Sequence, residues 1–206
     1  MNKMKHTIKK SVAKYLVELL IVAFGVFLGI MVSEQKAKNR TNENISNSRD
    51  MIVEELEVNR QNLVHAVEYH EKIKKGFDTL KTNLSEDIIF SFYFSSNKFR
   101  QEQIPGWSGL GIYKIEDVAF ESAKISGIFH SMDINDVKQI SSAYRQLHSY
   151  SEFGTMITQK VIAMDSQTKI LDVVGILEML TNDFLNNEKH LMNDLDKTIA
   201  KLKEEN

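Results

Sequence analysis

The order of apolar and polar positions divides the chain into one uninterrupted apolar stretch and several stretches with a helical repeat. Residues 15–33, YLVELLIVAFGVFLGIMVS, are apolar apart from Glu18 near the start and Ser33 at the end. No charged or strongly polar side chain occurs between residues 19 and 32. A helix needs about 20 apolar residues to cross the hydrocarbon core of a bilayer. The pattern therefore predicts a transmembrane helix over 15–33.

Two alternatives for this stretch are a cleaved export signal and a buried helix of a soluble domain. A cleaved signal has a shorter apolar core and small residues before the cut, whereas bulky Met31 stands three residues before the best candidate site. A buried helix fits less well, because a basic tail leads directly into a surface that is apolar on all sides. We therefore expect an uncleaved membrane anchor.

Basic residues flank the predicted span unequally. Those before it are Lys3, Lys5, Lys9, Lys10 and Lys14, and those after it are Lys36, Lys38 and Arg40. Cytoplasmic flanks of membrane helices carry an excess of lysine and arginine. This bias predicts a cytoplasmic basic tail over 1–14, a single pass through the inner membrane and an exported C-terminal domain. The reverse orientation stays open, because the difference is small.

Four polar or small residues of the span are candidates for membrane helix packing. Gly25, Gly29 and Ser33 are four residues apart, so they share a helix face on which a second helix could approach closely. This predicts a homo-oligomer or a membrane protein partner. Glu18 has two interpretations: a carboxylate solvated near the headgroups, where Lys14 is one turn away, or a contact with a partner helix.

After the span, polar residues 34–50 predict either a hydrated spacer or the start of a long helix. Their later part is rich in asparagine and serine, which favours a break or caps.

A clear helical repeat follows in the predicted bundle domain, 51–206. Its apolar positions are Ile52, Leu56, Leu63, Val67, Ile73, Phe77, Leu80 and Leu84. Asn59 and His70 fill the two gaps in this repeat. Asn59 is interpreted either as a register-fixing residue of an oligomer or, preferably, as a hydrogen-bonding residue at a helix–helix boundary.

The middle of the chain contains the segments that interrupt the helical pattern. Residues 88–95 alternate like a strand, but no second strong strand exists to pair with them, so they predict a short helix or an extended connector that adds aromatics to the core. The stretch IPGWSGLGIYKIED predicts a loop that contains Trp107. Trp107 is either a possible partner contact or a residue that anchors the loop to the core.

The C-terminal half predicts further helices. A short helix over 115–127 ends at Gly127, and Asp133 begins a longer one. The apolar face of this longer helix is Val137, Ile140, Tyr144, Leu147, Tyr150, Phe153, Ile157, Val161 and Met164. The sequence DSQTK interrupts the pattern, with Ser166 or Thr168 as the next N-cap. A last helix is expected to begin near Thr181, with Phe184, Leu191, Leu195, Ile199 and Leu202 on its inner face. The predicted fold is all-α: an N-terminal transmembrane helix followed by an antiparallel helical bundle with one long helix.

Composition excludes several classes of site. The chain has no cysteine, which excludes disulfides and zinc–thiolate sites, and its net charge of −2 gives no bias toward nucleic acid. No histidine follows a glutamate at the spacing of a di-metal bundle, and the pairs His148/Glu152 and His190/Asp194 are interpreted as surface contacts. The acidic run at Glu54, Glu55 and Glu57 is interpreted as a solvated face. We therefore expect no catalytic residue, no metal and no cofactor.

Three short motifs resemble those of a family of uncharacterised single-pass membrane proteins common in the Bacteroidota. They are Glu18 before the Gly25-centred span, EELEVNRQNL with Leu56, Asn59 and Leu63, and AFESAKISG ending at Gly127, with Tyr144 beyond. Members often have an asparagine–tryptophan pair after the span, where this chain has Glu34 and Gln35. The resemblance implies a membrane location and an exported helical region, and it supplies no activity.

Two functional hypotheses follow from this architecture. In the first, the exported domain is a non-enzymatic interaction or scaffold module anchored in the lipid bilayer. In the second, it is a sensor that binds a small ligand and signals through a separate membrane partner, because the cytoplasmic tail is too short to hold an output domain. A membrane-attached enzyme has no supporting residue.

Overall fold

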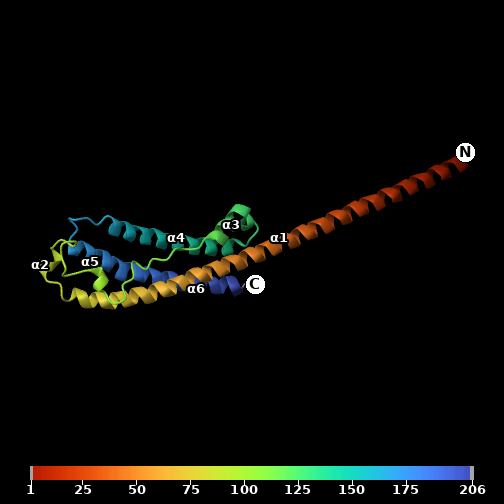
Figure 1. The fold of residues 1–206 in the computed structure, drawn as a ribbon. Coiled ribbons are helices and arrows are strands. Elements are labelled where there is room, and N and C mark those ends of the chain that lie inside the picture. Colours follow the sequence, from red (N-terminus) through yellow and green to blue (C-terminus); the bar gives the residue numbers. More distant parts are fainter. Residues whose placement is uncertain (1, 205–206) are drawn as a thin grey trace. The chain divides into compact units, whose positions relative to one another are not determined.

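Figure 1 shows the computed structural model, which describes residues 2–204, with side chains from residue 14 onward. Every regular element in this part of the chain is a helix, so the predicted all-α fold is confirmed. The chain divides into two compact units, Met1–Asn47 and Ser48–Asn206. The side chains of Lys3, Lys5, Lys9 and Lys10 in the predicted basic tail lie outside the described residues.

The first helix, α1 (Asn2–Lys81), includes both the apolar stretch and the polar residues after it. Of the two predictions for 34–50, the structure has the helix, and the break expected from its asparagines and serines is absent. Polar side chains here bond along the helix instead of competing with it. Gln35 Nε2 donates to Asn39 Oδ1 (2.9 Å), and Thr41 Oγ1 donates to the Ala37 carbonyl (3.0 Å).

The helical domain, Ser48–Asn206, contains the other helices. They are α2 (Glu86–Ile89), α3 (Val118–Ser126), α4 (Ile134–Ile162), α5 (Ile170–Glu178) and α6 (Leu185–Glu204). Two single turns of 3-10 helix, η1 (Gln101–Gln103) and η2 (Ile128–His130), lie in the connections. A π-helical turn, η3 (Met179–Phe184), joins α5 to α6 without a break. Asp133 caps α4, because its side chain accepts a hydrogen bond from the Asn135 N–H (2.7 Å), and Gly127 ends α3 in the left-handed conformation (φ 73°). Both of these predictions are confirmed.

The long helices of this domain do not all alternate in direction. Ion pairs join α1 to α6 in opposite order: Arg60 with Asp196 (2.9 Å), Glu71 with Lys189 (2.6 Å) and Glu57 with Lys203 (2.6 Å). By contrast, α4 runs in the same direction as this part of α1, because Arg49 meets Asp136 (2.5 Å) and Glu55 meets Tyr144 further along both helices. The long connection through α2 and α3 allows this arrangement, since it returns the chain to the starting end of the domain (Figure 1).

The core is formed by the apolar faces predicted for these helices. Fully buried side chains from the predicted repeats include Ile52, Leu56, Leu63, Ile73, Phe77, Ile140, Tyr144, Leu147, Tyr150, Ile157, Phe184, Leu191 and Leu195. Asn59 and His70, which fill the gaps in the first repeat, are buried as well. The periodicity therefore identified the inner faces of the long helices, including the polar members Asn59 and His70, although Val67, Leu80 and Leu84 of the first repeat are only half-buried.

One local prediction was right in part and two were wrong. Residues 88–95 contain the end of the short helix α2 (Glu86–Ile89) and a connector without helix, as predicted, but of the aromatics in this stretch only Tyr93 enters the core. The N-cap of α5 is Lys169, not Ser166 or Thr168, because the Asp172 carboxylate accepts a hydrogen bond from the Lys169 N–H (2.8 Å). No helix begins at Thr181. That residue lies inside η3, and its hydroxyl donates to the Leu177 carbonyl (2.8 Å).

Candidate functional site

A connecting segment without helix, residues 104–117, lies between η1 and α3 and is held by side chains of α1. Tyr69 Oη donates to the Gly109 carbonyl (2.6 Å) and accepts from the Ser108 N–H (3.0 Å). Gly111 adopts a φ of 65°, and a Cβ there would lie 2.3 Å from the Tyr69 ring. Only glycine fits such a close approach in this conformation. The segment is therefore fixed in one path over α1.

Asn59 fixes the far end of the same segment. Its side-chain amide donates to the Glu116 carbonyl (2.7 Å) and accepts from the Glu116 N–H (2.8 Å). Asn59 thus satisfies both polar groups of one backbone residue, as a paired strand would. Sequence analysis favoured a hydrogen bond at a helix–helix boundary. The bond exists, but its partner is the connecting segment.

The middle of the segment is bonded to a buried histidine–glutamate pair. His70 and Glu188 are both fully buried, and His70 Nδ1 lies 2.8 Å from Glu188 Oε2. His70 Nε2 lies 2.7 Å from the Leu110 carbonyl. The other oxygen of Glu188, Oε1, is 3.4 Å from Tyr150 Oη. Three helices, α1, α4 and α6, therefore meet the connecting segment at this cluster.

The partners of His70 determine where its protons lie. A carbonyl oxygen only accepts, so His70 Nε2 carries a hydrogen that it donates to Leu110. One further proton lies between Nδ1 and Oε2, either as an imidazolium facing a carboxylate or as a neutral imidazole accepting from a carboxylic acid. Burial raises the pKa of Glu188, and hydrogen bonding and charge from His70 oppose this rise. In both forms the buried pair is neutral as a whole.

The His70–Glu188 pair was not predicted, although each residue has a signal in the sequence. His70 was recognised as a gap in an apolar repeat, but it was not paired with any residue. Glu188 falls on the inner face of α6, four residues after Phe184 and three before Leu191. A carboxylate at such a register position needs a buried partner. That partner is on a helix more than a hundred residues earlier, so spacing alone could not identify it.

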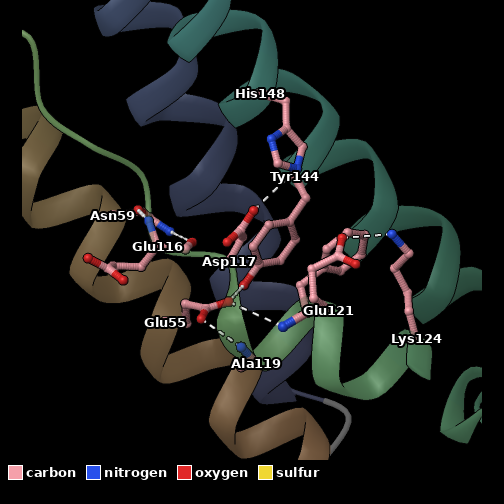
Figure 2. A network of polar contacts seen from close by, with 10 residues as sticks. Glu55, Asn59, Glu116, Asp117, Ala119, Glu121, Lys124, Tyr144 and His148 are labelled. Carbon is pink, nitrogen blue, oxygen red and sulfur yellow. Dashed lines mark hydrogen bonds and ion pairs between the residues drawn. The ribbon is translucent and has the colours of Figure 1, made fainter. Parts of the chain in front are cut away.

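A second polar network surrounds Glu55 (Figure 2). Its carboxylate accepts hydrogen bonds from the Ala119 N–H (2.7 Å), the Phe120 N–H (3.3 Å) and Tyr144 Oη (2.5 Å). The first two groups are unsatisfied amides at the start of α3, where a negative charge also complements the helix dipole. Glu55 is therefore the N-terminal cap of α3 supplied from α1, and its interpretation as part of a solvated acidic face was wrong.

Tyr144 is the buried member of the Glu55 network. Its ring stacks on Phe120 with 4.2 Å between centroids. Burial and the hydrogen bond to Glu55 raise the pKa of Tyr144, so its hydroxyl remains a donor at all physiological pH values. Figure 2 also shows His148 turned toward Asp117, and 3.8 Å separates His148 Nε2 from Asp117 Oδ2.

We expect Tyr144→Phe to lower the free energy of unfolding by about 1.5–3 kcal/mol, the range for a hydrogen bond to a charged group. Phenylalanine retains the stacking on Phe120, so the change isolates the hydroxyl. Thermal and urea unfolding of the purified protein measure the effect. The matched control is Tyr113→Phe, because the Tyr113 side chain is 38% exposed. Equal stability of the two variants would contradict the role assigned to the Glu55 contact.

The residues predicted for membrane helix packing lie in the first unit, Met1–Asn47. Glu18 Oε1 is 3.8 Å from Lys14 Nζ, as expected for its solvated interpretation. A Cβ added at Gly25 or Gly29 would meet no atom within 4 Å, and Ser33 is exposed. The glycine face is therefore uncovered within the described chain, and its role in packing stays a prediction.

Trp107 is half-buried and packs against the apolar core near Ile73, Phe77 and Leu177. It also borders a cavity of about 170 Å³ between the connecting segment, the end of α4 and α5. This placement agrees with a loop anchored by its largest side chain. A role of Trp107 as a partner contact stays a prediction.

Among residues whose side chains are described, no group of three histidine, aspartate or glutamate side chains could hold a metal ion. His190 and Asp194 border the same shallow hollow on α6, lined also by Arg145 and Ser149 of α4.

Taken together, the polar side chains of the helical domain attach the connecting segment and α3 to the long helices. Asn59, Tyr69 and His70 hold the segment, and Glu55 holds the helix that follows it. Comparison with protein-family models, curated proteins and solved structures gives no match to this chain.

Proposed function

We propose that this chain is a single-pass inner-membrane protein whose exported helical domain is a non-enzymatic interaction module. The observation that supports a membrane anchor is the exposure of the apolar side chains in residues 15–33. α1 is long and apolar enough to cross a membrane, with a mean hydropathy of 2.5 over its most apolar 18 residues, none of them buried in the described structure. In water such a surface is costly, at roughly 25 cal/mol for each Å² of apolar area. A lipid bilayer removes this cost, which supports the anchor.

The orientation belongs to the same proposal. A cytoplasmic N terminus follows from the excess of lysine before the span. The resemblance to the Bacteroidota family of single-pass proteins agrees with this arrangement, and we propose that relationship together with it. The packing face of Gly25, Gly29 and Ser33 would then join two spans, in a homo-oligomer or with another membrane protein.

An exposed aromatic patch on the helical domain supports the interaction function. Phe90, Phe92 and Phe94 alternate along the connector after α2 and are 57%, 45% and 48% exposed. Backbone hydrogen bonds join the connector to the start of α5: the Tyr93 N–H donates to the Thr168 carbonyl (2.8 Å), and the Ile170 N–H donates to the Ser91 carbonyl (3.0 Å). Aromatic side chains are enriched in the buried centres of protein interfaces. We therefore propose these three phenylalanines, called the Phe patch, as the contact with a protein partner.

Crosslinking and capture from membranes test this role of the Phe patch. We expect the variant Phe90→Ser/Phe92→Ser/Phe94→Ser to lose at least ten-fold in recovery of a crosslinked partner, because truncating such anchors removes most of the binding energy. The matched control is Val118→Ser/Ile125→Ser/Ile134→Ser, which removes side chains that are 67%, 85% and 68% exposed elsewhere on the domain. Unchanged recovery with the first variant would exclude the patch.

The alternative function, sensing of a small extracytoplasmic ligand, is supported by one observation. The cavity beside Trp107 is bordered by residues of the connecting segment, which is itself bonded to α1 through Tyr69 and His70. A ligand in this cavity would contact the same segment. In this alternative, the signal would pass through the predicted span to a separate membrane partner.

A further inference from the structure

We infer that the cavity beside Trp107 is a binding site for a small neutral molecule built on a single apolar ring. The inference rests on the sensor function proposed above, since it names the ligand class that such a sensor would take. It does not depend on the membrane orientation or on the Phe patch.

The volume of the cavity limits what it can hold. It measures about 170 Å³. An engineered apolar cavity of about 150 Å³ in another protein binds benzene. A single six-membered ring therefore fits, whereas two fused rings with substituents do not.

The lining sets the polarity of the ligand. The walls come from Trp107 and Leu110 of the connecting segment, Val161 and Met164 at the end of α4, and Val173 and Leu177 of α5. The backbone carbonyls nearby are already used, because Gly109 accepts from Tyr69 and Leu110 accepts from His70. No charged side chain borders the cavity. A charged ligand would lose its hydration without compensation, so the ligand is neutral.

Gln101 supplies one polar contact. Its side-chain oxygen accepts a hydrogen bond from Tyr93 Oη, which orients the amide. Gln101 borders the cavity, and its amide nitrogen carries donors that the contact with Tyr93 does not use. One hydroxyl or carbonyl oxygen on the ring would accept this bond. Binding sites of this kind combine an apolar wall with a few such placed polar groups.

Fluorescence of Trp107, the only tryptophan in the chain, tests the inference directly. The full-length protein in dodecyl maltoside micelles is titrated with 3-bromophenol, whose bromine quenches an indole that it contacts. We expect quenching that saturates. The variant Val161→Phe fills the cavity from a half-buried wall position and should weaken apparent affinity at least ten-fold. Its matched control, Ile162→Phe, adds the same ring at the adjacent residue, which is 76% exposed, and should bind like the native protein.

The outcomes separate binding from signalling. Quenching that rises linearly without saturation would overturn the inference, and so would equal quenching of Val161→Phe and the native protein. Either result would show that the bromophenol only collides with Trp107 in the micelle. Thermal unfolding of Val161→Phe without ligand shows whether the variant is folded. If it is not, Leu110→Phe replaces it, with the same expectation. Saturable binding that leaves crosslinking between membrane proteins unchanged would support the site and reject the sensor function.

Discussion

Replacing His70 with leucine should lower the free energy of unfolding by about 3–5 kcal/mol, the cost of removing one partner from a buried charged pair. Leucine is apolar and close in size, so little packing is lost. Glu188 would remain fully buried without the imidazole that shares its proton, and the Leu110 carbonyl would lose its donor. For a domain of this size the loss corresponds to a fall in Tm of roughly 6–20 °C. Thermal unfolding of the full-length protein followed by circular dichroism measures it.

The pH dependence of this loss identifies its cause. Burial raises the pKa of Glu188 above its ordinary value of 4.5, so the folded state keeps its proton to a higher pH than the unfolded state does. A group whose pKa is raised in the folded state contributes its full stabilisation at a pH below its ordinary, unfolded pKa. This stabilisation is lost as the pH rises through the raised pKa of the folded state. In His70→Leu, where no imidazole opposes the rise, the deficit should therefore be smaller near pH 4 than at pH 7.

Two further variants control for a general disturbance of α1. His65→Leu makes the same change five residues earlier, at a side chain that is 53% exposed, and should alter stability by less than about 0.5 kcal/mol. The double variant His70→Leu/Glu188→Met replaces the pair with apolar groups and should recover most of the loss, because the unpartnered acid is removed. If the double variant is less stable than His70→Leu, the pair is not the source of the effect.

Replacing Phe24 and Phe27 with arginine should move the protein out of the membrane. Each arginine near the centre of a span costs about 2.5–3.5 kcal/mol on the insertion scale, and each lost phenylalanine removes about 0.3–0.6 kcal/mol. Together the two changes cost roughly 6–8 kcal/mol. The ten leucine, isoleucine, valine and phenylalanine residues between 19 and 32 supply only roughly 3–6 kcal/mol. Insertion would then be unfavourable.

Alkaline extraction of membranes measures this change as the share of protein left in the pellet. Both phenylalanine side chains are more than half exposed, so the substitutions remove no packing within the described structure. The control Phe24→Leu/Phe27→Leu retains the apolar length and should stay in the pellet. If the arginine variant also stays there, the stretch 15–33 is not what attaches the protein to membranes.

Much of the fold could be predicted from sequence because helical periodicity is a local property. The repeats of Ile52 to Phe77 and of Ile140 to Ile157 give the inner faces of α1 and α4 directly. The caps at Asp133 and Gly127 are also local, since each depends on one residue and its neighbours. By contrast, the π-helical turn at Met179–Phe184 has no sequence signal of its own, and its polar residues, Thr181 to Asp183, favoured a helix start.

The polar clusters could not be predicted for a different reason. Glu55 looks like any glutamate of a charged helix face until α3 is placed against it. Glu188 and His70 are far apart in sequence, and only the fold brings them within hydrogen-bonding distance. The residues that hold the connecting segment are thus defined by tertiary contacts. The apolar stretch of residues 15–33 is defined by composition alone, and in the structure it lies in a helix long and apolar enough to cross a membrane.

The most direct test of the proposed exported domain is to measure on which side of the membrane the helical domain lies. Alkaline phosphatase, which is active only after export, is fused after Asn206 and expressed in a bacterial host, beside a matched fusion to a fluorescent protein that is bright only in the cytoplasm. We expect high phosphatase activity and a dark fluorescent fusion, which would place the domain outside the cytoplasm. Inactive phosphatase with a bright fluorescent fusion would contradict the proposed orientation and place the Phe patch and the Trp107 cavity in the cytoplasm.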